Sequence, residues 1–348
     1  MAKFILSYWF SLDKLIISVL LLLSVSGNGV FCSPMFIFGD STVDPGNNNY
    51  IKTIAENQAN YEPYAEYANL PIIPPFLQPS ADYINGVNFA SGGAGVLPET
   101  NQGLVIDLPT QLKSFEKVEK WLVEKLGEES AQKVITEAVY FISIGSNDYM
   151  AGYLGNPKTR ELYNPEQYVG MVIGNLTQAV QVLYEKGGRK FGFLSLCPLG
   201  CLPIFRALSP KASEGQGVCL EEASALASAH NNALRSVLTS LEFLLKGFKY
   251  SNSNFYDWLY DRINHPTKHG FKDGVKACCG TGPYGGIYSC GGRKNITEYQ
   301  LCPDVDDYVW WDSVHATQRI HQQLAMGPLP LSAHIISNTS SSTRPNSQ

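Results

Sequence analysis

Three short apolar runs along the chain predict buried β-strands. They span residues 35–38, 138–144 and 191–196, and most of their side chains are apolar. Runs of this length are typical of strands that are covered on both faces of a sheet. Gly39 follows the first run and Gly145 the second, so we expect a turn where each of these strands ends.

Between these runs, the spacing of apolar residues changes to that of amphipathic helices. Asp107 and Pro109 mark the start of a helix whose apolar residues share one face, and two further helices are predicted over residues 165–184 and 221–245. The residues on the shared face of the first helix are Leu112, Phe115, Val118, Leu122 and Leu126. Strands that alternate with helices indicate an α/β fold with a parallel sheet.

Polar segments follow two of the predicted strands directly. Gly39-Asp40-Ser41-Thr42 comes after the first strand, and Gly145-Ser146-Asn147-Asp148 comes after the second. Ligands of open parallel sheets bind beyond the carboxyl ends of the strands. We therefore expect Ser41 and Asn147 to lie at one edge of the sheet, in a functional site.

A carboxylate and an imidazole are placed to form an acid–base pair near the C-terminal end. Asp312 lies three residues before His315, and none of the other five histidines has a carboxylate at this spacing. The Asp312 side chain can turn back to hold one imidazole nitrogen, which leaves the other free as a base. The alternative is that Asp312 caps a helix and the histidine is incidental.

Ser41 is the candidate nucleophile for that base. We expect it at the start of a helix, where the N-terminal field favours an anion forming nearby. The alternative is that Asp40 and Ser41 only cap this helix, because both residue types are favoured at that position.

Donors for a developing oxyanion are also present. The Asn147 side-chain amide could be joined by the backbone N–H groups of Ser41 and of a glycine within Ser91-Gly92-Gly93. A plain turn or a phosphate cradle is the alternative for these glycines, but the dinucleotide pattern Gly-x-Gly-x-x-Gly is not matched. No Gly-x-Ser-x-Gly sequence occurs in the chain, which argues against the common α/β-hydrolase arrangement.

Charge and the N-terminal pattern bear on partners and location. The formal net charge is −5 and there is no run of Lys and Arg, so a nucleic-acid groove is not expected. The apolar stretch at residues 15–25 follows Lys3 and Lys14, as in a secretory signal, and is shorter than the roughly 20 residues of a membrane span. We predict a signal peptide at 1–32, a secreted, extracellular domain at 33–326 with no membrane anchor after cleavage, and a disordered tail at 327–348.

Glycosylation and disulfides are expected of an exported chain. Acceptor triplets begin at Asn175, Asn295 and Asn338. Loss of Cys32 with the signal would leave seven cysteines, and therefore at least one unpaired thiol. A zinc site is disfavoured because there is no Cys-x-x-Cys pair, so we expect disulfides. The predicted bridges join Cys201 to Cys219 and lie within the group Cys278, Cys279, Cys290 and Cys302.

Eight motifs along the chain together resemble one known family. They lie at residues 38–41, 44–50, 86–95, 145–149, 188–191, 278–280, 290–292 and 311–315. The set is similar to that of the plant GDSL-type esterase/lipase family, a branch of the SGNH hydrolases, and the likeness runs from Met35 to about Gln323.

The resemblance implies a fold, a reaction and a set of roles. The fold would be a three-layer α/β/α sandwich with a central, mainly parallel sheet. The reaction would be hydrolysis of carboxylic esters, with a small-molecule ester or lipid as substrate and no metal or cofactor. By motif, Ser41 would be the nucleophile, His315 the base oriented by Asp312, and Gly92 and Asn147 the oxyanion donors.

The chain also departs from the family pattern. Thr42 replaces the usual Leu or Ser, which is a mild change, and the tail after Met326 lacks the usual ending. A segment of two to three helical turns and a loop is expected to be missing between Tyr64 and Ala65. Two alternatives to a secreted esterase or lipase therefore stay open: a non-catalytic glycoprotein that binds lipid or a partner, and a polysaccharide acetyl esterase.

Overall fold

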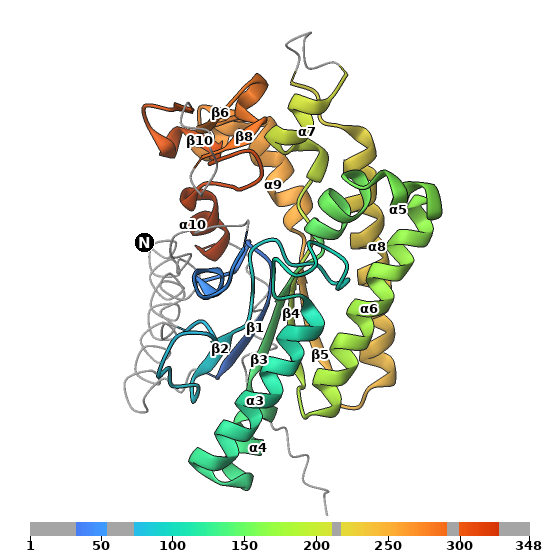
Figure 1. Ribbon diagram of the computed structural model, residues 1–348, viewed down its shortest axis with the longest axis vertical. Coiled ribbons are helices and arrows are strands. Elements are labelled where there is room, and N and C mark those ends of the chain that lie inside the picture. Colours follow the sequence, from blue (N-terminus) through green and yellow to red (C-terminus); the bar gives the residue numbers. More distant parts are fainter. Residues whose placement is uncertain (1–32, 54–72, 211–216, 291–298, 327–348) are drawn as a thin grey trace, which may run out of the picture. The chain divides into compact units, whose positions relative to one another are not determined.

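A five-stranded parallel sheet forms the centre of the computed structural model (Figure 1). The structure describes residues 33–53, 73–210, 217–290 and 299–326. The strands lie in the order β2-β1-β3-β4-β5, and every neighbouring pair is parallel. Their bounds are β1 Met35–Gly39, β2 Gly86–Asn88, β3 Val139–Ser143, β4 Lys190–Leu194 and β5 Lys249–Ser253.

Helices cover the sheet and make the fold an α/β sandwich, as predicted. The connections from β2 to β3, β3 to β4 and β4 to β5 all advance in the same direction across the sheet. Because such crossovers are right-handed, their helices lie on one face, where α3 packs against α6 and α6 against α8. Helix bounds in these connections are α3 Leu108–Leu126, α4 Glu128–Glu137, α5 Pro157–Leu162, α6 Pro165–Glu185, α7 Pro203–Leu208 and α8 Glu221–Leu244.

Two of the predicted helices begin where expected, and each start carries a side-chain cap. Asp107 accepts a hydrogen bond from the Thr110 N–H at 2.8 Å, and a proline occupies the first turn of α3. Asn164 and Gln167 form a reciprocal capping box at the start of α6. Each cap satisfies backbone donors that have no partner within the helix.

An aromatic cluster fastens α3 to the sheet. Phe115, on the apolar face of α3, is fully buried. Its ring lies 5.0 Å from that of Phe36, 6.0 Å from that of Phe38 and 5.8 Å from that of Tyr140. This packing fixes the helix against β1 and β3, whose carboxyl ends carry the polar segments.

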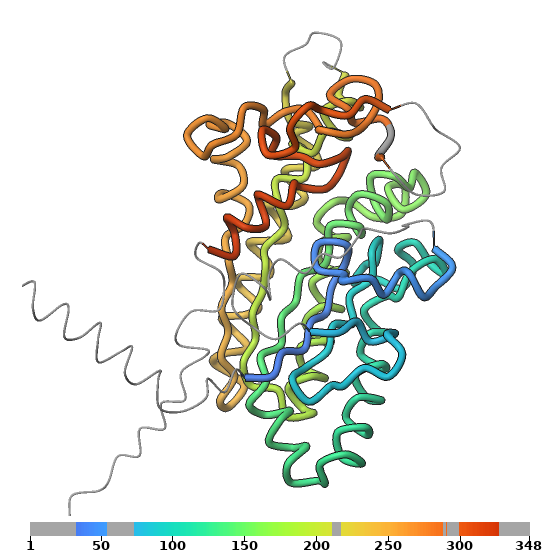
Figure 2. The backbone as a smooth tube through the Cα atoms, turned by 90° about the vertical axis from the view of Figure 1, so that its left-hand side faces the viewer, coloured from blue at the N-terminus to red at the C-terminus, as the bar shows by residue number. Residues whose placement is uncertain are grey.

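The segments after β5 form small elements, which lie toward one end of the sheet while α4 lies at the other (Figures 1 and 2). The helices are α9 Phe255–Asn264 and α10 Gln318–Met326, and the strands are β6 Asp273–Ala277, β7 Cys279–Thr281, β8 Tyr288–Ser289, β9 Gln300–Leu301 and β10 Tyr308–Trp310. Short helices are η1 Asn47–Tyr50, the π-helical η2 Asp148–Leu154, η3 Leu199–Cys201, η5 Pro266–His269, η6 Pro283–Gly285 and η7 Val305–Asp307.

The disulfide prediction is confirmed. Bridges join Cys201 to Cys219, Cys278 to Cys302 and Cys279 to Cys290. Among the described residues the unpaired cysteine is Cys197. Crosslinks therefore order the glycine-rich region around β7, which has few apolar side chains of its own.

Several predictions fall on residues outside the described ranges. They concern the signal peptide, the tail, the acceptors Asn295 and Asn338, and the missing segment before Ala65. Asn175 is described, and its side chain is exposed on α6. No helix in the described ranges is long and apolar enough to cross a membrane.

Removing the bridge between Cys201 and Cys219 should destabilise the chain without a change of fold. The bridge joins residues that are 18 positions apart, and replacing both by alanine removes this restriction from the unfolded chain. A loop of about this length corresponds to about 3 kcal/mol of unfolding free energy. Urea denaturation of the double variant measures the loss, and an unchanged midpoint would contradict the prediction.

Candidate active site

Three side chains predicted to act together form a continuous chain of hydrogen bonds. The Nε2 atom of His315 lies 3.0 Å from the Oγ of Ser41, and its Nδ1 lies 3.0 Å from both carboxylate oxygens of Asp312. Ser41 comes from the turn after β1, and the other two come from the loop after β10. With Nδ1 facing a carboxylate, the proton belongs on Nδ1, and Nε2 can accept from the Ser41 hydroxyl.

The backbone around Asp312 explains why the three-residue spacing works. Its Oδ1 also accepts from the N–H groups of Val314 at 2.9 Å and His315 at 2.7 Å. The Trp311 N–H donates to the His315 carbonyl at 2.8 Å, which closes the loop on itself. Burial acts to raise the pKa of Asp312, but His315 and these N–H groups outweigh it and hold that pKa below its ordinary value.

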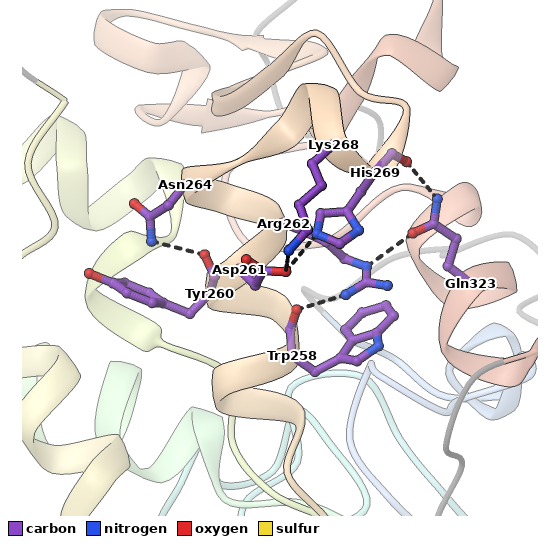
Figure 3. A network of polar contacts seen from close by, with 8 residues as sticks. All are labelled: Trp258, Tyr260, Asp261, Arg262, Asn264, Lys268, His269 and Gln323. Carbon is purple, nitrogen blue, oxygen red and sulfur yellow. Dashed lines mark hydrogen bonds and ion pairs between the residues drawn. The ribbon is translucent and has the colours of Figure 1, made fainter.

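A polar network fastens the helix that follows this loop (Figure 3). The Nε of Arg262, on α9, donates to the Gln323 side chain on α10 at 3.0 Å, and Gln323 donates to the His269 carbonyl at 2.9 Å. The His269 ring in turn lies 2.6 Å from the Asp261 carboxylate. Since α10 begins three residues after His315, this network limits the movement of the loop that carries His315.

Ser41 lies on a tight turn and not at a helix start, so that part of the prediction was wrong. Residues 40–43 form a turn closed by the Val43 N–H and the Asp40 carbonyl, and the next element is η1. A Cβ atom on Gly39 would lie 2.5 Å from the Ser143 carbonyl oxygen, so glycine is required where β1 ends beside β3. The helix field invoked for the nucleophile is therefore absent.

A buried glutamine holds the end of β1. Gln111, on α3, is fully buried. Its side-chain carbonyl accepts from the Gly39 N–H at 2.9 Å, and its amide donates to the Gly39 carbonyl at 2.8 Å. The helix thereby fixes the backbone two residues before Ser41, a contact that apolar spacing alone could not reveal.

Asn147 lies beside the glycine-rich segment, as predicted. Its Nδ2 donates to the Ala94 carbonyl at 2.9 Å, which leaves the second hydrogen of this amide available. Its neighbour Asp148 is buried and accepts from the N–H groups of Val96 and Leu97 at 2.8 and 3.0 Å. The segment after β3 thus anchors the far end of the glycine-rich loop.

The hydrogen bonding differs from expectation at Gly92. Its N–H donates to the Asp44 carboxylate at 2.9 Å and is engaged there. The next N–H, that of Gly93, has no acceptor among the described residues, and the same holds for the N–H of Ser41. Within Ser91-Gly92-Gly93, the backbone donor that is free is therefore Gly93.

Sequence reasoning missed the environment of His230. This residue of α8 is buried, and its Nδ1 lies 2.9 Å from the Tyr149 hydroxyl. Burial lowers the pKa of His230 to about 3, so it stays neutral. No local pattern in the sequence indicates this contact, because it joins residues that are 81 positions apart.

Comparison with known proteins identifies the family. A family model described as GDSL-like Lipase/Acylhydrolase matches residues 35–327. The chain belongs to the GDSL-type esterase/lipase family. It is 47% identical to "GDSL esterase/lipase 5" of Arabidopsis thaliana over 84% of this chain and 80% of the relative.

Two further members of the GDSL-type family support the same assignment. The chain is 41% identical to "GDSL esterase/lipase 1" of Arabidopsis thaliana, with 84% of each covered. It is 39% identical to "GDSL lipase" of Tanacetum cinerariifolium, over 84% of this chain and 82% of the relative. The chain is thus an ester-bond hydrolase of the SGNH group.

The comparison also bears on chain length. The 315 residues compared with the first relative exceed 84% of this 348-residue chain, so part of that length has no counterpart here. This is expected if a segment is missing, although the predicted position between Tyr64 and Ala65 lies outside the described residues.

The buried carboxylate next to Ser41 should make stability depend on pH. Burial raises the pKa of Asp40 from 3.8 to about 6, so the folded chain binds this proton more tightly than the unfolded chain. The contribution of Asp40 to the free energy of unfolding is therefore fully present below about pH 4 and is lost as the pH rises through about 6. Between about pH 4 and pH 6, the free energy of unfolding of the parent should fall by up to about 3 kcal/mol relative to that of Asp40→Asn. Urea denaturation at each pH measures this difference. A constant difference would contradict the assigned shift.

Proposed function

We propose that this chain is a secreted serine esterase or lipase that forms an acyl-enzyme on Ser41. The observation that carries the proposal is the hydrogen-bonded series from Ser41 through His315 to Asp312, with each link at 3.0 Å. An alcohol oxygen on a tight turn, next to a base that is itself oriented by a carboxylate, is the arrangement that activates serine for attack on a carbonyl.

In the proposed reaction, His315 moves a proton twice. Nε2 accepts the Ser41 proton while Oγ attacks the ester carbonyl, and the same proton then passes to the departing alcohol. Water, deprotonated by His315, attacks the acyl-enzyme and releases the acid. Asp312 stabilises the imidazolium, in keeping with its lowered pKa.

The oxyanion of each tetrahedral intermediate would rest on three donors. These are the N–H groups of Ser41 and Gly93 and the second hydrogen of the Asn147 amide, none of which is used by an acceptor among the described residues. Gly93 takes the place that the resemblance gave to Gly92, because Asp44 engages the Gly92 N–H. Donors fixed in advance stabilise the charged intermediate without reorganisation.

Secretion is supported by independent features of the chain. The N-terminal apolar stretch has the length of a signal sequence, and three disulfides suit an oxidising compartment. Asn175 begins a glycan acceptor triplet and is exposed on α6, so we propose glycosylation there. Enzyme digestion of glycans from plant-expressed protein would test this assignment.

The substrate proposal is a small-molecule ester or a lipid, in line with relatives named esterases and lipases. Membership of a hydrolase family and the intact series of hydrogen bonds weigh against a non-catalytic glycoprotein. An acetyl esterase and a lipase are separated by one measurement, the kcat/KM for acyl esters of increasing chain length. A maximum at the acetyl ester would exclude a lipase.

Ser41→Ala should abolish labelling by a fluorophosphonate probe. Ester hydrolysis should fall by about 10⁴–10⁶-fold, and adding His315→Ala should lower it little further, because the two residues act as one unit. Thr42→Ala, on the same turn, is the matched control and should keep its labelling. Parental turnover in Ser41→Ala would exclude it as the nucleophile.

Asn147→Ala should reduce turnover and leave substrate affinity almost unchanged. The variant removes one donor from the oxyanion but keeps the nucleophile and its base, and the expected loss of kcat is about 10²–10³-fold. Steady-state kinetics on a soluble ester measures both parameters. A rise in KM at constant kcat would instead assign Asn147 to substrate binding.

A further inference from the structure

The peptide group between Gly92 and Gly93 is held from its buried side by a single side chain. The Nδ2 of Asn48, a residue of η1 that is 5% exposed, donates to the Gly92 carbonyl at 2.9 Å. The Oδ1 of the same side chain accepts from the Ser91 hydroxyl at 2.5 Å. Asn48 therefore binds the carbonyl oxygen of the Gly92–Gly93 peptide, and the N–H of this peptide is that of Gly93.

Planarity of that peptide decides where the N–H points. In a trans peptide the carbonyl and the N–H point to opposite sides, and no described peptide bond is cis. With the Gly92 oxygen turned inward to Asn48, the Gly93 N–H must point away from it. Gly92 is buried and Gly93 half-buried, which agrees with an N–H directed to the accessible side.

The turn itself does not fix this orientation. Residues 91–94 form a turn closed by the Ala94 N–H and the Ser91 carbonyl at 3.0 Å, with Gly93 at φ +84°. Two consecutive glycines lack the Cβ atoms that would prevent rotation of the peptide between them. An outside contact must therefore set the direction of the Gly93 N–H.

The ends of this loop are secured by other residues. The Ser91 N–H donates to the Gly39 carbonyl at 3.1 Å, and Asn147 binds the Ala94 carbonyl at 2.9 Å. The loop thus runs from the turn of Ser41 to Asn147, the two other sources of oxyanion donors. Asp44 holds the Gly92 N–H at 2.9 Å, so Gly92 is gripped through both of its backbone groups.

We propose that Asn48 is a positioning residue of the oxyanion hole, which turns the Gly92–Gly93 peptide so that the Gly93 N–H faces the developing oxyanion. Asn48 is not one of the reacting groups, and it would act on the reaction through the peptide that it binds. The inference rests on the proposed function. It adds a residue that affects turnover by orienting a peptide from the buried side of the loop.

Asn47 provides a matched control in the adjacent position. It is fully buried, and its Nδ2 donates to the carbonyls of Asn88 and Ala90 at 2.9 Å each. It is thus an asparagine of the same short helix that binds the same loop, but it does not bind the Gly92–Gly93 peptide. Loss of Asn47 should cost stability at least as much as loss of Asn48.

The experiment compares Asn48→Ala, Asn48→Asp and Asn47→Ala on p-nitrophenyl butyrate. For Asn48→Ala we expect kcat per folded molecule to fall about 10- to 100-fold with KM within about twofold, since a donor is misdirected but not removed. The inhibition constant of phenylboronic acid, whose adduct with Ser41 places a hydroxyl in the oxyanion hole, should rise by a similar factor. Asn48→Asp, which presents an acceptor to the Gly92 carbonyl, should lose at least as much and carries the test if the alanine variant does not fold.

Asn47→Ala should lower the melting temperature and keep kcat within about threefold of the parent. Equal losses of kcat in Asn47→Ala and the Asn48 variants would overturn the proposal, and so would an unchanged kcat in both Asn48 variants. These outcomes are independent of the proposed function, which fails only if Ser41→Ala remains active.

Discussion

The active site depends on one constraint: backbone groups in buried loops must be hydrogen-bonded although no strand continues beside them. Beyond the carboxyl ends of β1, β2 and β3, side chains take over the role that the sheet has played. Gln111 binds both backbone groups of Gly39, and Asn47 binds the carbonyls of Asn88 and Ala90 where β2 ends. Asp148 binds two N–H groups of the loop after β2. Each contact that satisfies the backbone also fixes its position, so the same bonds that offset the cost of burying these loops hold their backbone in place.

The same constraint separates the buried carboxylates into two kinds. For Asp40 and Asp148 burial is the largest influence, and it raises the pKa of each to about 6. Asp312 is equally buried, yet the nearby imidazole and the loop N–H groups hold its pKa below the ordinary value. The negative charge of the site is therefore most secure at Asp312, where it can stabilise a protonated His315.

The sequence allowed the interior of the fold to be predicted, but not the contacts between its loops. Strands β1, β3 and β4 are largely buried and mostly apolar, whereas the edge strand β5, Lys249–Ser253, is polar and gave no signal. Ser41, His315 and Asp312 could be predicted because their chemistry is local or carried by motifs. The turn at Ser41 and the engagement of Gly92 by Asp44 could not, since they depend on side chains that meet across 48 residues or more.

Ser41 and His315 lie 274 residues apart in the sequence, so their 3.0 Å contact depends on how firmly the C-terminal segment is anchored. The loop of His315 is held on one side by β10, which pairs with β6, and on the other by α10, which Gln323 ties to α9 and η5. The bridge from Cys278 to Cys302 closes the intervening chain next to β6. A displacement of about 1 Å can lower turnover about 100-fold. If His315 is the base that we propose, these elements far from the sheet therefore contribute to catalysis by fixing its imidazole, just as Asn48 would contribute by fixing a peptide.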